Sequence, residues 1–176
     1  LADIQGLPQK NLAFEMLRKL INDEIKVRGR KNIVEARSFQ EMLQASILKY
    51  QNRGIETAEV LQELIELANK IQASQERGEQ LGLNESEIAF YDALAKNDSA
   101  LTSLGDETLK AIARELADRI RKSATIDWTI KETVRAEMRA MVRRLLRKYK
   151  YPPDQQEATT ELVLQQAETL AIVFAA

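Results

Sequence analysis

Glycine and proline are scarce in this chain, and their placement constrains its fold more than any other feature. Only six glycines and three prolines occur among 176 residues, and they fall between segments in which apolar residues recur every three or four positions. That spacing puts apolar side chains on one face of a helix, and glycine and proline are the residues that end helices. The sequence predicts an all-α fold: a single domain, residues 1–176, of about seven helices in a helical bundle, with residues 1–7 as an irregular lead-in.

The expected helices are placed by their caps and breaks. Asn84, followed three residues later by Glu87, matches a capping box, and Thr57, Asp106 and Asp154 are expected to cap three other helices. Residues 78–82 are expected to form a polar joint, and residues 97–105 a loop or a single turn. The expected helices run over about 8–29, 32–52, 57–78, 84–96, 106–122, 127–151 and 154–176.

The composition argues against an autonomous enzyme. The chain contains no cysteine and no histidine, which excludes disulfides, thiolate chemistry, the usual zinc sites and the commonest general base. No GxxxxGK[ST] phosphate-binding loop occurs, so we expect no catalytic residue, no metal site and no cofactor in these residues. No apolar run reaches membrane-spanning length, so we expect no membrane partner and a cytoplasmic location. Both ends of the chain suggest a piece of a longer protein.

The expected helix from Asp127 to Tyr151 carries a ridge of arginines. Four of them are spaced four residues apart, so they stack along one side of the helix. Like charges at this spacing repel by about 0.2–0.5 kcal/mol per pair, so the ridge costs on the order of 1 kcal/mol unless an anion lies against it. The candidate DNA- or partner-binding residues of this helix are Lys131, Arg135, Arg139, Arg143, Arg144 and Arg147.

Three anions would relieve this repulsion, and the residues alone leave the choice open. One is the acidic surface of the third expected helix, Glu56 to Glu66, which would form a charge ladder within the chain. Another is a nucleic-acid backbone, for which four phosphate contacts predict a log–log salt slope of about −3 to −4. Trp128 and Tyr149 could then stack on bases, although a lone tryptophan is more often a core residue. The third is an acidic patch on another subunit.

Several motifs in a fixed order resemble a known family. The segments are Arg30–Val34, Ser38–Leu43, Lys49–Arg53, Ile55–Val60, Glu63–Ile65, Gly82–Leu83, Ala89–Leu94, Thr125–Trp128 and Val134–Pro153. Together they are similar to the carboxy-terminal helical domain of the motor (R) subunit of type I restriction endonucleases. The resemblance covers nearly the whole chain.

The resemblance implies a part of a larger machine. In that family an amino-terminal nuclease domain cuts DNA, and two helicase-like domains translocate it with ATP and magnesium. Neither the nuclease carboxylates nor the ATP loop occurs in these residues, so no catalytic residue carries over. The implied role is assembly. The domain would dock the motor on the methyltransferase and specificity subunits, beside the helicase domains of its own subunit and near the DNA. The alternative is a module that contacts the DNA backbone through the ridge from Arg135 to Arg147.

Overall fold

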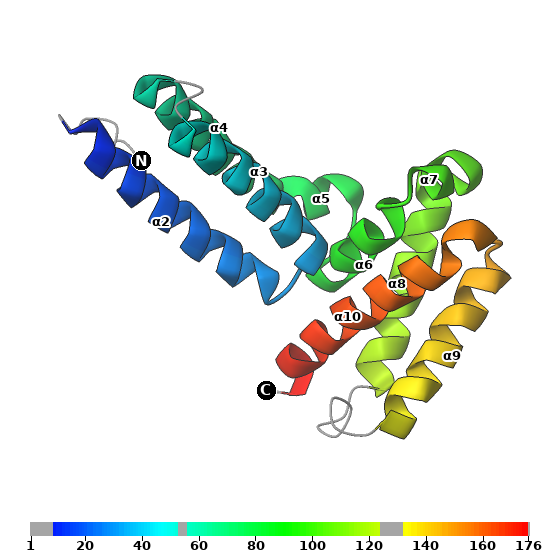
Figure 1. Ribbon diagram of the computed structural model, residues 1–176. Coiled ribbons are helices and arrows are strands. Elements are labelled where there is room, and N and C mark those ends of the chain that lie inside the picture. The colour runs from blue at the N-terminus through cyan, green and yellow to red at the C-terminus, as the bar shows by residue number, and fades with distance from the viewer. Residues whose placement is uncertain (1–8, 53–55, 124–131, 176) are drawn as a thin grey trace. The chain divides into compact units, whose positions relative to one another are not determined.

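A computed structural model describes residues 9–52, 56–123 and 132–175 of the chain (Figure 1). All regular secondary structure in these three ranges is helical, which confirms the predicted all-α class. The expected start of the basic helix at Asp127, the side chain of Trp128 and the candidate residue Lys131 lie outside the described residues.

The helices gather into two compact units, each with an apolar core of its own. The first unit consists of Leu1–Gly29 and Glu35–Arg77. The second consists of Arg30–Val34 and Gly78–Ala176. The chain therefore enters the second unit twice, first with Arg30–Val34 and then with Gly78–Ala176.

The first unit is built from three long helices: α2 (Lys10–Gly29), α3 (Ile33–Gln51) and α4 (Thr57–Ala73) (Figure 1). Apolar side chains at helical spacing face inward from all three. The largest of those that are almost fully buried are Phe14, Leu17, Ile21, Leu43, Leu64 and Ile71.

Polar contacts lock one end of this unit. The Arg28 Nη1 donates to Glu35 Oε1 at 2.9 Å and to Ser74 Oγ at 2.7 Å, and Arg77 Nη1 donates to Glu35 Oε2 at 3.1 Å. The side chains of Arg28 and Glu35 are each only 12% exposed, so this ion pair is largely shielded from water. The contacts join the last turn of α2, the first turn of α3 and the 3-10 helix η1 (Ser74–Glu76).

The second unit packs α6 (Glu85–Ala95), α8 (Asp106–Ser123) and α10 (Gln156–Ala175) around its core, with α9 (Glu132–Lys148) against α8 and α10. The motif Phe90–Asp92 lies in this packing. Phe90 is fully buried, and the Tyr91 hydroxyl donates to Asp106. Other deeply buried side chains here are Leu94, Leu109, Ile112, Leu116, Leu146 and Tyr151.

The first entry of the chain into the second unit is held by side chains. Asp92 Oδ2 accepts from Asn32 Nδ2 at 2.7 Å, and Lys31 Nζ lies 3.0 Å from Glu85 Oε2. Gln166 of α10 is fully buried and bonds the backbone of the same segment on both of its sides. These contacts explain why Arg30–Val34, the joint after α2 together with the first two residues of α3, belongs to the second unit.

The predicted capping box is confirmed, but the three other predicted caps, Thr57, Asp106 and Asp154, are wrong. Asn84 accepts from the Glu87 N–H at 2.9 Å while Glu87 Oε1 accepts from the Asn84 N–H. Helix α4 begins at Thr57 itself, and its N-cap is Glu56. Helix α8 begins at Asp106, whose carboxylate accepts from Tyr91 and lies 3.0 Å from Lys110 Nζ instead of capping.

Short helices occupy the stretches expected to be joints. Residues 78–82 largely belong to α5 (Arg77–Leu81), and α7 (Asp98–Leu104) replaces the expected loop or single turn. Asn97 caps α7 by accepting from the Ser99 N–H at 3.1 Å. Asp154 does not cap the last helix, because it lies in the 3-10 helix η2 (Pro153–Gln155) that precedes α10.

Helix α9 ends before the two prolines that were expected to terminate it. Lys150 adopts a left-handed backbone conformation with φ of 57°. The Tyr151 N–H donates to the Leu146 carbonyl and the Lys150 N–H to the Arg147 carbonyl. This pair of bonds is a Schellman motif, in which lysine stands where glycine is usual.

Candidate interaction surface on helix α9

The helical period places apolar and basic side chains on different faces of α9. Four apolar residues face inward: Met138, Val142, Leu145 and Leu146. Arg135, Arg139 and Arg143 flank this buried stripe on the side of α10 and each has an ion pair there, whereas Arg144 and Arg147 are exposed and have none in the described part of the chain. The arginines of this helix therefore form two sets with different surroundings.

The first set is an ion-pair ladder with α10. Arg135 Nη2 lies 2.7 Å from Glu168 Oε1, Arg139 Nη2 lies 2.8 Å from Glu161 Oε1, and Arg143 Nη2 lies 2.8 Å from Glu157 Oε2. The two helices run side by side in opposite directions (Figure 1), so arginines taken in ascending order meet glutamates in descending order. We call these six residues the α9–α10 ladder.

The ladder supplies carboxylates for three of the four ridge arginines, and they come from α10, which was not among the candidates expected from the sequence. The prediction that Glu56 to Glu66 would pair with the ridge is wrong, because α10 provides all three partners. Glu63 of that acidic surface instead accepts from Lys49 Nζ and Ser46 Oγ of α3, each at 2.9 Å, which lowers the pKa of its carboxyl.

A signal for the true partner was present in the sequence. Glu157, Glu161 and Glu168 are spaced four and seven residues apart, so they share one face of the helix that directly follows the basic one. Consecutive helices joined by a short turn are usually antiparallel neighbours. The acidic face of the next helix was therefore the nearest candidate.

The ladder is a surface feature of modest strength. The arginine side chains are 51%, 40% and 37% exposed, and Glu157 is 72% exposed. Pairs as accessible as these contribute about 0–1 kcal/mol each, because water and salt screen them. The ladder also removes the repulsion between successive arginines, which is a comparable term.

Arg144 and Arg147 form the second set. Both are exposed, and neither has an ion pair or hydrogen bond to any other residue in the described part of the chain. Of the six candidate residues, three thus belong to the ladder, two face solvent and Lys131 lies outside the described residues.

The Tyr149 hydroxyl is bound to α8, which does not favour stacking of its ring on a nucleic-acid base. Its hydroxyl donates to Glu115 Oε2 at 2.7 Å, and Glu115 Oε1 accepts from Arg119 at 2.8 Å and from Lys148 at 3.3 Å. The bond from Tyr149, followed by those from the two cations, lowers the pKa of the Glu115 carboxyl. The same bond raises the pKa of the Tyr149 hydroxyl, because it favours the protonated phenol beside a carboxylate.

Residues 9–52, 56–123 and 132–175 offer neither a metal-binding cluster of acidic, cysteine or histidine side chains nor a membrane-spanning helix. No three side chains of histidine, cysteine, aspartate or glutamate are arranged there to hold a metal ion. None of the helices in these ranges combines the length and the apolar character that a membrane crossing requires.

Comparison with known proteins identifies the class of this all-α chain. Residues 1–172 match a family described as type I restriction enzyme HindI endonuclease subunit-like, C-terminal. The chain belongs to this family, as a C-terminal domain of the endonuclease (R) subunit, and the resemblance carried by its motifs is confirmed.

Two curated relatives agree with this assignment. The type I restriction enzyme HindI endonuclease subunit of Haemophilus influenzae is 40% identical over 171 residues, which are 97% of this chain and 16% of that protein. The putative type I restriction enzyme MjaIXP endonuclease subunit of Methanocaldococcus jannaschii is 35% identical over 151 residues, or 84% of this chain and 14% of that protein. The chain thus spans about one sixth of these relatives. No solved structure matches it.

Proposed function

We propose that this chain is a non-catalytic assembly domain of a type I restriction enzyme motor subunit. It docks the nuclease and the ATP-dependent translocase on the methyltransferase and specificity subunits during restriction of foreign DNA. The observation that carries the proposal is the extent of the family match. It spans residues 1–172 of this chain but only about one sixth of the relatives, which are endonuclease subunits. ATP and magnesium would bind the subunit outside these residues.

The α9–α10 ladder favours a role in assembly over one in binding phosphate. Three of the ridge arginines already have carboxylate partners within hydrogen-bonding distance. The repulsion along α9 is therefore relieved without an external polyanion, and a phosphate at these positions would have to displace a glutamate.

Co-purification tests the proposal. The full-length subunit and a version lacking this domain are each mixed with a tagged methyltransferase–specificity complex. We expect the full-length subunit to co-purify and the truncated one to be lost, while ATP binding by the truncated subunit shows that its remaining domains are folded. Retention of a folded truncated subunit by the complex at the full-length level would overturn the proposal.

A second function, contact with a DNA backbone, is favoured by Arg144 and Arg147. They are exposed on one helix and free of partners within the described residues. Two phosphate contacts would give a log–log salt slope of about −2. Titration of duplex DNA at two salt concentrations tests this function, and a variant carrying Arg144→Glu and Arg147→Glu should lose the affinity. No binding at low salt removes this candidate.

A further inference from the structure

We propose that the outward apolar face of α2 docks against the remainder of the endonuclease subunit, the part that lies outside this chain. The occupant would be an apolar segment of the preceding domains of the same polypeptide. This inference rests on the proposed function only in treating the chain as part of a longer motor subunit.

Four large apolar side chains form the outward face. Leu12, Met16, Leu20 and Val27 are 47%, 44%, 46% and 53% exposed. At 3.6 residues per turn, their spacing of four, four and seven residues places them within about 80° of one side of the helix. We call these four residues the α2 stripe.

The α2 stripe is separate from the face by which α2 joins its own unit. Phe14, Leu17, Ile21 and Ile25 are at most 4% exposed and pack in the core with α3 and α4. A helix at the surface of a globular protein normally has one apolar face and one polar face. Helix α2 therefore has more apolar surface than the described part of the unit covers.

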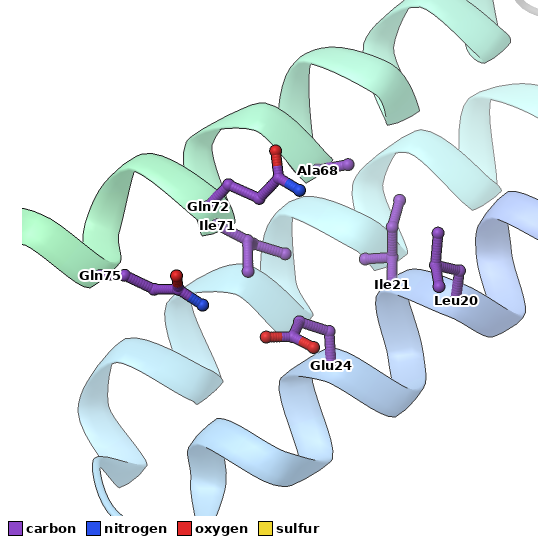
Figure 2. Close-up of a pocket in the computed structure, with 7 residues that line it drawn as sticks. All are labelled: Leu20, Ile21, Glu24, Ala68, Ile71, Gln72 and Gln75. Atoms are coloured by element: carbon purple, nitrogen blue, oxygen red, sulfur yellow. The ribbon is translucent and has the colours of Figure 1, made fainter. Parts of the chain in front are cut away.

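A pocket continues the α2 stripe toward α4. It has a volume of about 450 Å³ and lies between α2 and the end of α4 (Figure 2). Leu20 belongs to both the stripe and the pocket. Apolar side chains share the lining with polar ones from both elements. The lining residues are Leu20, Ile21, Glu24, Ala68, Ile71, Gln72 and Gln75.

The stripe and the pocket together suit an apolar helix or strand of a partner. Single exposed apolar residues are ordinary at a protein surface, whereas an aligned set beside a concave, partly apolar pocket marks an interaction site. An apolar side chain of the partner would enter the pocket, and Glu24, Gln72 and Gln75 would bond polar atoms beside it.

The length of the relatives identifies the occupant. The match covers 16% and 14% of the two curated subunits, and the matched family is the C-terminal part of such subunits. Most of the polypeptide in these relatives therefore precedes the matched segment. Helix α2 is the first helix described in this chain, so it is the described helix nearest in sequence to those preceding domains.

Two methionines give a direct test within one molecule. Met16 lies in the α2 stripe and is 44% exposed, while Met42 lies on α3 and is 41% exposed. Methionine oxidation needs access of the oxidant to the sulfur. Treatment with dilute hydrogen peroxide followed by peptide mass spectrometry therefore gives an oxidation rate that reports how accessible each methionine is. Met138 is 4% exposed and serves as the protected reference.

We expect Met16 and Met42 to oxidise at similar rates in the 176-residue chain. In the full-length subunit we expect Met16 to react several-fold more slowly than Met42. Equal rates in the full-length subunit would overturn the proposal. Protection of Met16 already in the 176-residue chain would also overturn it. If Met16 is protected in the 176-residue chain and the protection rises with protein concentration, the occupant is a second copy of the chain. If the protection does not depend on protein concentration, the occupant is another part of the same chain.

Variants make the test specific to the α2 stripe. In the full-length subunit, Leu12→Gln with Leu20→Gln should raise the oxidation rate of Met16 to that of the 176-residue chain. Leu48→Gln changes a 54% exposed leucine of α3 outside the stripe and should leave the rate unchanged. An unchanged Met16 rate in the stripe variant would contradict the docking. Failure of the docking would leave association with the methyltransferase–specificity complex intact, so the two proposals fail separately.

Discussion

Gln166 bonds the backbone of a segment 133 residues earlier in the chain. Its Oε1 accepts from the Ile33 N–H at 2.9 Å, and its Nε2 donates to the Lys31 carbonyl at 2.7 Å. The side chain is fully buried, so it replaces water for two backbone groups that no helix satisfies. One amide thus fixes the segment Arg30–Val34 on α10.

Replacing Gln166 with alanine should release this segment. Each of the two partly buried backbone groups left without a partner costs about 1–3 kcal/mol, so we expect Gln166→Ala to destabilise the second unit by about 2–6 kcal/mol. Amide hydrogen exchange provides the measurement, because the Ile33 N–H should exchange much faster in the variant. Gln62→Ala, at an exposed position of α4, is the control and should leave Ile33 protected. Unchanged exchange at Ile33 would contradict the assigned role of Gln166.

Charge reversal tests the α9–α10 ladder. Arg143→Glu places a carboxylate against Glu157 and should lower stability by about 1 kcal/mol at low salt. The double variant Arg143→Glu with Glu157→Arg restores an opposite pair and should recover most of the loss. Thermal denaturation at two salt concentrations measures both effects. Arg144→Glu, at an unpaired position of the same helix, should change stability less, and an equal loss there would argue against the ladder.

Lys150 holds a backbone conformation that suits glycine better. A residue with a β-carbon in the left-handed region is strained by about 1–2 kcal/mol. Glycine removes this strain, but it loses more conformational entropy on folding, which offsets part of the gain. We expect Lys150→Gly to stabilise the protein by up to about 1 kcal/mol, measured by chemical denaturation. Lys96, the C-cap of α6 with φ of −59°, is the matched control, and Lys96→Gly should be neutral or destabilising. Destabilisation by Lys150→Gly would show that the lysine side chain itself matters.

The Glu115 carboxyl should contribute to the acid sensitivity of the second unit. Its folded pKa lies below the ordinary value of 4.5, first because Tyr149 donates to it. A carboxyl with a lowered folded pKa adds stability above its unfolded pKa, and this stability is lost as the pH falls through the folded pKa. Between about pH 5 and pH 3 the melting temperature should therefore fall less steeply in Glu115→Gln than in the parent chain. Tyr149→Phe should give a shallower slope too, and identical slopes in all three proteins would refute this explanation.

Features set by neighbouring residues were predictable from the sequence. The all-α class follows from apolar spacing between breaks, and the capping box follows from Asn84 and Glu87 three residues apart. The arginine ridge likewise showed that an acidic partner was needed. The family followed from motifs, because they are local and keep their order along the chain.

Features set by tertiary packing were not predictable in the same way. The partner of the ridge depends on which helices become neighbours, and α10 takes that place instead of the acidic surface Glu56 to Glu66. The assignment of Arg30–Val34 to the second unit depends on Gln166, whose long-range bonds leave no local pattern. The end of α9 at Lys148 depends on the left-handed conformation of Lys150, which lysine rarely adopts.

The antiparallel ladder also determines the long-range electrostatic field on this side of the second unit. Each guanidinium is cancelled by a carboxylate within 3 Å, so beyond a Debye length of about 8 Å in physiological salt the three pairs project almost no electric field. A molecule that approaches this side is neither steered nor repelled by it. Long-range attraction toward an acidic partner would then arise from Arg144 and Arg147, the unpaired arginines of the same helix.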